Sequence, residues 1–241
     1  MTEKLYFNDP YQKEFEAEII AVEGNAVRLN KSLFYPTSGG QPGDTGILSA
    51  ANQNFDIMAT LKDKEHDDVI HLLPEGCSLP QVGDKVSGKI DWDTRYKHMR
   101  MHTAMNLLCS LIEGDATGGQ IGAEKSRLDF NVPGDAYDKE ALTTELNALI
   151  KADHPVSTSW ITDEELQANP GLIRTMSVKP PMGSGKVRTV RIGTEDNMVD
   201  YQPCGGTHVK STAEIGKIRV SKIENKGKQN RRFHIILDEE G

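Results

Sequence analysis

The 241-residue sequence lacks most features of secreted, membrane and disulfide-built proteins. Its three cysteines, Cys77, Cys109 and Cys204, are an odd and sparse set that argues against a disulfide framework and suits a reducing cytosol. No apolar run approaches the roughly 18 residues of a membrane-spanning helix. The N-terminal residues show no basic segment followed by an apolar stretch, so they do not resemble a secretory signal. These absences predict a cytoplasmic protein without a membrane partner, and no obligate protein partner is evident.

Basic residues are also fewer than acidic ones. The chain has 28 Lys and Arg against 36 Asp and Glu, a net charge of −8, which counts mildly against nucleic-acid binding. The distribution is uneven, however, because residues 210–233 carry eight basic residues and only two glutamates. This basic C-terminal segment is either a local footprint for RNA or a solvated strand-turn-strand surface, and charge alone does not separate the two.

What the sequence does contain predicts an α+β fold in two parts. Short strands punctuated by glycine and proline, including the glycine-rich loop "TSGGQPGDTG", predict a small β-barrel at the N-terminus. The pattern changes at Asp91, where a helical period begins that Asp93 or Thr94 can cap and Gly114 can end. The predicted domains are a β-barrel domain at 1–90 and an α+β domain with a helix-borne metal site at 91–241.

Two pairs of residues suggest a metal site. His98 and His102 are one helical turn apart, and Cys204 and His208 flank two glycines that allow a tight backbone turn. Imidazole and thiolate are the ligands that zinc prefers, and three such ligands would leave a coordination position for water or substrate. His98 lies nearest the apolar stripe of the helix, so it is alternatively a hydrogen-bonded core histidine. The metalloprotease motif HExxH is absent.

Several motifs together resemble the free-standing alanyl-tRNA editing proteins, the AlaX-type relatives of the editing domain of alanyl-tRNA synthetase. The motifs are "FYPTSGGQPGDTG", "MRMHTAMNLL", "TGGQIGAEKSRLDF", "PPMGSGKVRTVRIG" and "DYQPCGGTHV", and the resemblance covers nearly the whole chain. It implies the medium-length form of the family, in which a glycine-rich barrel precedes a zinc-dependent editing domain. It also implies hydrolysis of seryl esters of tRNA(Ala), with glycyl esters as a second candidate.

One position departs from the family pattern. The family helix usually reads His-Thr-x-x-His, which corresponds to His102 and position 106, but position 106 is Asn here. Asn is a poor zinc ligand beside imidazole. This leaves three alternatives. The site uses four ligands, His98, His102, Cys204 and His208. It uses three ligands, His102, Cys204 and His208, with Asn106 near the metal, or it has lost the metal. We favour the three-ligand site, with His98 as a contingent fourth ligand.

The resemblance assigns roles to other residues. The backbone amides of Gly205 and Gly206 are candidate oxyanion donors. A polar group must pair with the seryl hydroxyl if serine is to be selected over alanine. The candidates for binding the aminoacyl group lie in the glycine-rich loop, which otherwise is an ordinary turn: Thr37, Ser38, Gly39, Gly40 and Gln41.

The substrate also requires contacts with tRNA phosphates. Asp200 and Gln202 are candidates for orienting the metal ligands. The phosphate-binding candidates are Arg95, Lys97, Arg100, Arg127, Lys186, Arg188 and the basic C-terminal segment.

Three functions compete at this stage. The first is a trans-editing deacylase. The second is a catalytically lapsed relative that binds aminoacyl-tRNA, for which Asn106 is the sole argument. The third is an unrelated zinc hydrolase, which is disfavoured because no acidic residue stands beside the histidine pair at the spacing of a general base.

Overall fold

The computed structural model describes residues 1–241 except 51–52, 64, 133–136, 174–184 and 239–241. It is a mixed α and β structure in which strands predominate, as the sequence predicted. The chain divides into two compact units, Met1–Tyr96 and Lys97–Gly241, and each is described by itself. Whether domains at 1–90 and 91–241 fold independently stays a prediction. No helix among the described residues is long and apolar enough to span a membrane.

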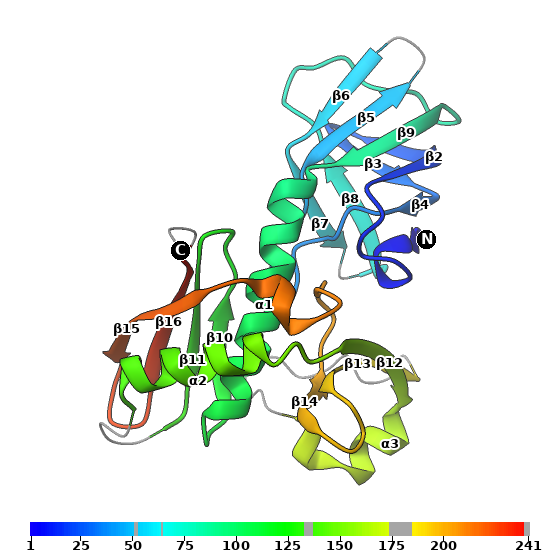
Figure 1. Ribbon diagram of the computed structural model, residues 1–241. Coiled ribbons are helices and arrows are strands. Elements are labelled where there is room, and N and C mark those ends of the chain that lie inside the picture. The colour runs from blue at the N-terminus through cyan, green and yellow to red at the C-terminus, as the bar shows by residue number, and fades with distance from the viewer. Residues whose placement is uncertain (51–52, 64, 133–136, 174–184, 239–241) are drawn as a thin grey trace. The chain divides into compact units, whose positions relative to one another are not determined.

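The first unit is built on a seven-stranded antiparallel sheet with the order β6-β5-β9-β2-β3-β8-β7 (Figure 1). No pairing between β6 and β7 closes it among the described residues, so the predicted barrel is not confirmed. A short parallel pair, β1 with β4, accompanies this sheet. The strands are β1 (Glu3–Lys4), β2 (Glu14–Glu23), β3 (Ala26–Leu29), β4 (Lys31–Ser32), β5 (Gly46–Ala50), β6 (Gln53–Ile57), β7 (Ala59–Asp63), β8 (Asp68–Leu72) and β9 (Lys85–Ile90).

Alternation along the strands explains the core of this unit. In β2 the side chains of Phe15, Ala17 and Ile19 are buried, while the glutamates between them face outward. Gly88 lies opposite Phe15 in β9, and a Cβ there would stand 2.2 Å from the phenyl ring. This glycine therefore makes room for the aromatic side chain of the neighbouring strand.

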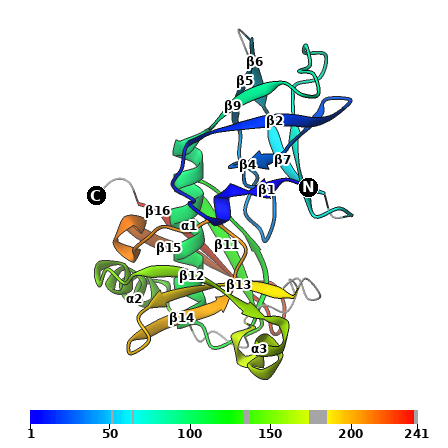
Figure 2. The ribbon, with the colours of Figure 1, turned by 90° about the vertical axis from the view of Figure 1, so that its right-hand side faces the viewer.

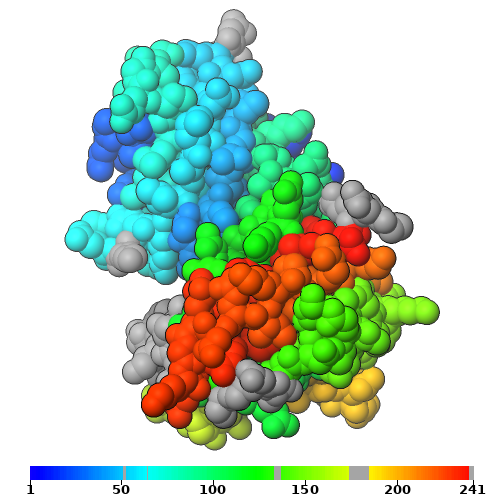
Figure 3. All heavy atoms as spheres, turned by 90° about the vertical axis from the view of Figure 1, so that its left-hand side faces the viewer, coloured from blue at the N-terminus to red at the C-terminus, as the bar shows by residue number. Residues whose placement is uncertain are grey.

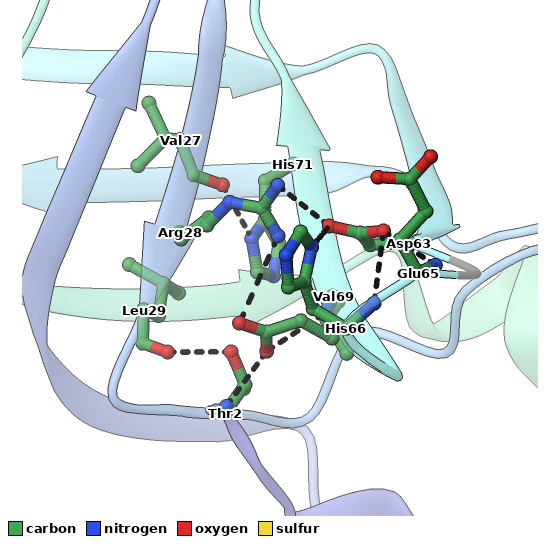
Figure 4. Close-up of polar contacts among 10 residues, drawn as sticks. Thr2, Val27, Arg28, Leu29, Asp63, Glu65, His66, Val69 and His71 are labelled. Atoms are coloured by element: carbon green, nitrogen blue, oxygen red, sulfur yellow. Dashed lines mark hydrogen bonds and ion pairs between the residues drawn. The ribbon is translucent and has the colours of Figure 1, made fainter.

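A polar cluster joins the N-terminus to β3 and β8 (Figure 4). The backbone N–H of Thr2 donates to Asp68 at 2.7 Å, and its hydroxyl donates to the carbonyl of Leu29 at 2.6 Å. Arg28 forms ion pairs with Asp63 at 2.8 Å and with Asp68 at 3.7 Å. All these groups satisfy one another, which gives the cluster a structural role.

Helix α1 (Trp92–Leu111) begins in the first unit and continues into the second. Its N-cap is Asp91, whose carboxylate accepts from the backbone N–H and hydroxyl of Thr94 at 3.2 and 2.8 Å. The predicted caps Asp93 and Thr94 were therefore two or three residues too late. Arg95 is fully buried in an ion pair with Asp44, so its prediction as a phosphate contact was wrong.

The second unit holds two antiparallel sheets, ordered β10-β11-β16-β15 and β12-β13-β14. Helix α2 lies against β15, where Asn147 accepts from the N–H of Ile218 at 3.1 Å and donates to its carbonyl at 2.7 Å. The orange to red atoms of β15 and β16 gather on the face that Figure 3 shows. The elements are β10 (Ala116–Gln120), β11 (Lys125–Phe130), α2 (Lys139–Lys151), β12 (Val156–Thr162), α3 (Asp163–Ala168), β13 (Lys186–Gly193), β14 (Met198–Pro203), β15 (Ile218–Asn225) and β16 (Arg231–Leu237). The described residues also include the short 3₁₀ turns η1 (Leu5–Phe7), η2 (Pro170–Leu172) and η3 (Thr212–Ile215).

Candidate metal centre

Three potential metal ligands converge in the second unit. His102 comes from α1, Cys204 directly follows β14, and His208 lies in the loop after it. The Cys204 Sγ atom is 3.3 Å from His102 Nε2 and 3.2 Å from His208 Nε2. The three ligand atoms lie within 4.8 Å of one another. Segments about one hundred residues apart thus bring one sulfur and two nitrogens to a single point.

Arg188 of β13 holds the cysteine loop in place. The backbone N–H of Cys204 donates to the carbonyl of Arg188 at 3.0 Å, which extends the β13–β14 ladder by one residue. The Arg188 guanidinium donates to the carbonyls of Cys204 and Gly206 at 2.9 and 2.8 Å. This side chain is buried, so its prediction as a phosphate contact was wrong. Its observed role is to fix the backbone that carries the thiol.

Thr103 determines which nitrogen of His208 carries the proton. The Thr103 hydroxyl donates to the carbonyl of Met99 at 2.9 Å, so it must accept the Nδ1–H of His208, 3.1 Å away. The Nε2 atom of His208 is therefore left with a lone pair that faces Cys204. A hydrogen bond at the far nitrogen is the usual means of orienting a metal-binding histidine.

Burial sets the protonation of the three groups. It lowers the pKa of His102 to about 3, helped by the charge of Arg188, and lowers the pKa of His208 to about 4. Burial raises the pKa of the Cys204 thiol, but His208, the Gly206 N–H and Arg188 outweigh it and leave this pKa below its usual value. Both imidazoles are therefore neutral at pH 7.

These groups fit a zinc ion. Tetrahedral zinc with ordinary Zn–S and Zn–N bond lengths places its sulfur and nitrogen ligands about 3.6 Å apart. The observed separations of 3.2 and 3.3 Å are close to that value. Neutral imidazole and thiolate are also the forms in which these residues bind metal.

The two remaining candidates on α1 have different surroundings. His98 is buried, but it does not belong to the group formed by His102, Cys204 and His208. Asn106 is 5% exposed and lies one turn beyond His102, about 6 Å along the axis. Its Nδ2 atom is buried and has no hydrogen-bond partner in the described part of the chain. The structure thus brings together the three ligands that we favoured, while His98 as a fourth ligand stays a prediction.

The two candidate oxyanion donors differ in their environment. Gly205 is exposed, and no atom lies within 4 Å of the place where a Cβ would be. Gly206 is buried, and its N–H is directed at the Cys204 thiol, where it contributes to lowering the pKa. Of the two amides, that of Gly205 has the more accessible position.

The glycine-rich loop belongs to the first unit. Ser38 and Gln41 exchange backbone hydrogen bonds of 3.1 and 2.9 Å around Gly39 and Gly40, whose φ angles of 56° and 81° favour glycine. The Thr37 hydroxyl donates to the carbonyl of Thr60 at 3.2 Å and accepts from the N–H of Gly43 at 2.9 Å. Gln41 is fully buried. The loop is therefore a well-defined turn, and its contact with an aminoacyl group stays a prediction.

The other predicted polar residues also have identifiable contacts. Arg100 donates to the carbonyl of Ile215 at 2.8 Å. Gln202 donates to Asp200 at 2.8 Å, and both are buried on β14 just before Cys204.

The basic C-terminal segment is partly neutralised. Lys222 and Lys226 pair with Glu224 at 2.8 and 2.6 Å, and Arg232 pairs with Asp129 at 2.7 Å. These ion pairs weaken, without removing, the argument for an RNA footprint on this hairpin.

Thr103 was not identified from the sequence, because no ligand spacing marks it. Its only signal is its position directly after His102 on the helix, and its contact with His208 depends on how the loop after β14 folds.

Comparison with known proteins identifies the relatives of this chain. Residues 187–234 match the family described as threonyl and alanyl tRNA synthetase second additional domain, and residues 4–94 match class II (A) tRNA synthetases. The chain is 39% identical to alanyl-tRNA editing protein AlaX-M of Methanosarcina mazei, over 98% of this chain and 97% of that protein. It is 38% identical to AlaX-M of Saccharolobus solfataricus over 98% and 99% of the two chains. An alanine–tRNA ligase of Archaeoglobus fulgidus is 39% identical over 93% of this chain but only 24% of its own length.

Proposed function

The chain belongs to the family of alanyl-tRNA editing proteins, and we propose that it hydrolyses the ester of mischarged Ser-tRNA(Ala) in trans, with Gly-tRNA(Ala) as a second candidate substrate. Editing proteins of this family are deacylases of tRNA(Ala), which makes the chain a hydrolase that acts in translation. Deacylation would take place in the cytoplasm, where tRNA is charged. The proposed architecture is the one inferred from the sequence, a glycine-rich barrel domain and an editing domain.

The observation that carries this proposal is the convergence of His102, Cys204 and His208. We propose that they hold one Zn²⁺ per chain, with His98 as a contingent fourth ligand. When bound, zinc would supply a Lewis acid beside the ester. The remaining work falls to the residues of the chain itself.

Those residues position the ligands and the substrate. Thr103 holds His208 in the tautomer whose Nε2 carries a lone pair for a metal, and Arg188 holds the backbone of the cysteine loop. The N–H of Gly205 would stabilise negative charge on the ester oxygen, because that of Gly206 is directed at the Cys204 thiol. The buried Nδ2 of Asn106 would donate a hydrogen bond to a group bound at the centre, which would remove the cost of leaving it unsatisfied.

Selection of serine over alanine requires a partner for the seryl hydroxyl. We propose the glycine-rich loop for this role, with Thr37, Ser38 and Gln41 as the polar groups and Gly39 and Gly40 as the turn that presents them. Arg100, which lies on α1 two residues before His102, would contact the tRNA. These assignments are supported by the resemblance of the loop to the family motif.

The test is single-turnover deacylation of Ser-tRNA(Ala) by protein of known zinc content, with Gly-tRNA(Ala) and Ala-tRNA(Ala) as parallel substrates. We expect selective release of serine, loss of activity after chelation and recovery with added zinc. Cys204→Ala should retain less than about 1% of the rate and lose stoichiometric zinc, because it removes one of three ligands. The matched control is Cys109→Ala, since this buried cysteine is not part of the ligand group.

A different outcome would favour the lapsed relative. If zinc-replete protein binds tRNA(Ala) but cleaves none of the three esters, Asn106 marks the loss of a catalytic ligand. If the protein cleaves simple esters without preference for aminoacyl-tRNA, the editing assignment itself fails.

A further inference from the structure

Trp160 is an exposed aromatic residue on an edge strand of the three-stranded sheet. It is one of two tryptophans, and the other, Trp92, stacks on Tyr96 with ring centroids 5.4 Å apart. Trp160 lies on β12, the edge of the sheet (Figure 2), and is 52% exposed. A single exposed hydrophobic residue needs no explanation by itself, so the argument depends on its neighbours.

The register places Trp160 in line with the metal centre. Trp160 lies directly opposite Arg188, and Cys204 extends the same ladder through its hydrogen bond to the Arg188 carbonyl. Residues directly opposite one another in an antiparallel sheet share a face. The hydroxyls of Ser159 and Thr189, 2.8 Å apart, lie on the other face, which is consistent with this assignment.

The row Trp160–Arg188–Cys204 thus crosses three strands on one face. With strands about 4.8 Å apart, the backbone of Trp160 is roughly 10 Å from that of the metal ligand Cys204. The exposed aromatic ring and the candidate site of ester cleavage are therefore on the same side of the sheet and two strands apart.

We propose that Trp160 stacks on the terminal adenine of the aminoacyl-tRNA while its ester lies at the metal centre. This inference rests on the proposed function. A single ribose joins the ester to that base, which suits a separation of two strands. Single-stranded RNA ends are commonly bound by stacking their bases on aromatic side chains, and any base offers a face for stacking.

The surroundings of Trp160 favour a nucleotide over a protein partner. On the same face its strand neighbours are the exposed hydroxyl residues Thr158 and Thr162, and the exposed Lys186 lies opposite Thr162. A protein interface would need an apolar core. An aromatic ring bordered by polar side chains instead resembles a surface on which a base stacks.

The first experiment measures how deacylation of Ser-tRNA(Ala) depends on enzyme concentration in single turnover. Trp160→Ala should raise the half-saturating concentration about 10-fold, and Trp160→Phe should largely restore it, because phenyl also stacks. Met198→Ala is the matched control, since Met198 is a similarly exposed residue, 56%, on β14 of the same sheet and should have no effect. Equal saturation curves for the wild type and Trp160→Ala would overturn the inference.

The second experiment needs no hydrolysis. Uncharged tRNA(Ala) transcripts with and without the 3′-terminal adenosine are bound to the wild type and to Trp160→Ala. We expect the substitution to weaken binding of the complete transcript about 10-fold and to leave binding of the shortened transcript unchanged. An equal loss for both transcripts, or no loss for either, contradicts stacking on the terminal base.

The two experiments separate this inference from the proposed function. If adenosine-dependent binding requires Trp160 but no ester is cleaved, stacking stands and the deacylase assignment fails. If serine is released normally and binding ignores both Trp160 and the terminal adenosine, the deacylase assignment stands and stacking fails.

Discussion

The two units bury polar groups in opposite ways. In the first, Arg95 and Asp44 are almost completely buried, and every contact is supplied by the protein. The guanidinium pairs with the carboxylate and also donates to the carbonyls of Leu33 and Pro10 at 2.6 and 3.2 Å. Asp44 accepts in addition from the N–H of Tyr35 at 2.5 Å. This arrangement is complete without a ligand.

In the second unit, His102, Cys204 and His208 bring one sulfur and two nitrogens together. Thr103 contacts the far nitrogen of His208, and Arg188 donates to the backbone carbonyl of Cys204. The contrast is clearest between histidines. His71 of the first unit donates from Nδ1 to the carbonyl of Val27 at 3.1 Å and accepts at Nε2 from Ser32 at 2.8 Å. His208 has the Thr103 hydroxyl at Nδ1, and its Nε2 faces the Cys204 thiol at 3.2 Å, next to His102. Buried polar groups that satisfy one another stabilise a fold, whereas a thiol and two imidazoles that converge on one point also form a set of metal ligands.

The largest effect on stability should come from the buried ion pair. Arg95→Met would leave the Asp44 carboxylate buried without its cation and should lower the free energy of unfolding by about 3–5 kcal/mol, measured by urea denaturation. The double variant Arg95→Met/Asp44→Leu should be less destabilised than this single variant. Lys85→Met is the control, because it breaks only the exposed pair with Glu18 and should cost less than about 1 kcal/mol. A loss as small as the control's would mean that the buried pair is not structural.

The second effect is a pH dependence of stability that originates at His71. Burial lowers its pKa to about 4, against 6.5 in the unfolded chain, so the unfolded state binds more protons between these values. His71 should therefore contribute full stability above pH 6.5 and lose about 3 kcal/mol as the pH falls to 4. The measurement is the unfolding free energy of the wild type and His71→Gln across this range.

The difference in unfolding free energy between the wild type and His71→Gln should shrink as the pH falls. Only the wild type carries at position 71 an imidazole that takes up a proton on unfolding but stays neutral when folded. A difference that stays constant from pH 7 to pH 4 would show that the His71 ring is protonated in the folded state.

The third effect tests whether Thr103 acts through His208. Thr103→Val removes the acceptor for the Nδ1–H and should weaken zinc binding about 10- to 100-fold, measured by competition with a chromogenic chelator. Thr143 of α2 is a close control, because its hydroxyl also donates to the carbonyl four residues earlier, at 2.6 Å, and accepts a strand N–H, from Val220, at 3.0 Å. Thr143→Val should leave the zinc affinity unchanged. If Thr103→Val and Thr143→Val bind zinc with equal affinity, Thr103 only packs in the core and does not orient His208.

The smallest effect concerns position 106. Asn106→His would add an imidazole one turn beyond His102 and should tighten zinc binding by about 10-fold. His98→Ala should leave the affinity unchanged if the centre has three protein ligands. Loss of zinc from His98→Ala would instead assign His98 as the fourth ligand.

Much of this protein follows from local pattern. Short β-like runs punctuated by glycine and proline predicted the strands of the first unit, and the helical period placed an α-helix after Asp91. The histidine and Cys-x-x-x-His motifs predicted candidate metal ligands, and five motifs together predicted the family, which is confirmed by relatives along the full length. Candidate ligands and family membership can therefore be recognised from short motifs, each of which is local in the sequence.

Only tertiary structure decided how those residues are used. On a helical wheel, positions 98, 102 and 106 are separated by steps of only about 40°, so sequence spacing cannot decide which of the three side chains faces a metal. The position of Cys204 after β14 decides which side chain it is, because the thiol lies next to His102. Likewise Arg95 and Arg188 resembled surface cations in the sequence, yet Asp44 and the carbonyls of the cysteine loop bury them. A charged residue is buried when the rest of the fold supplies its partners, and those partners lie 16 to 85 residues away along the chain.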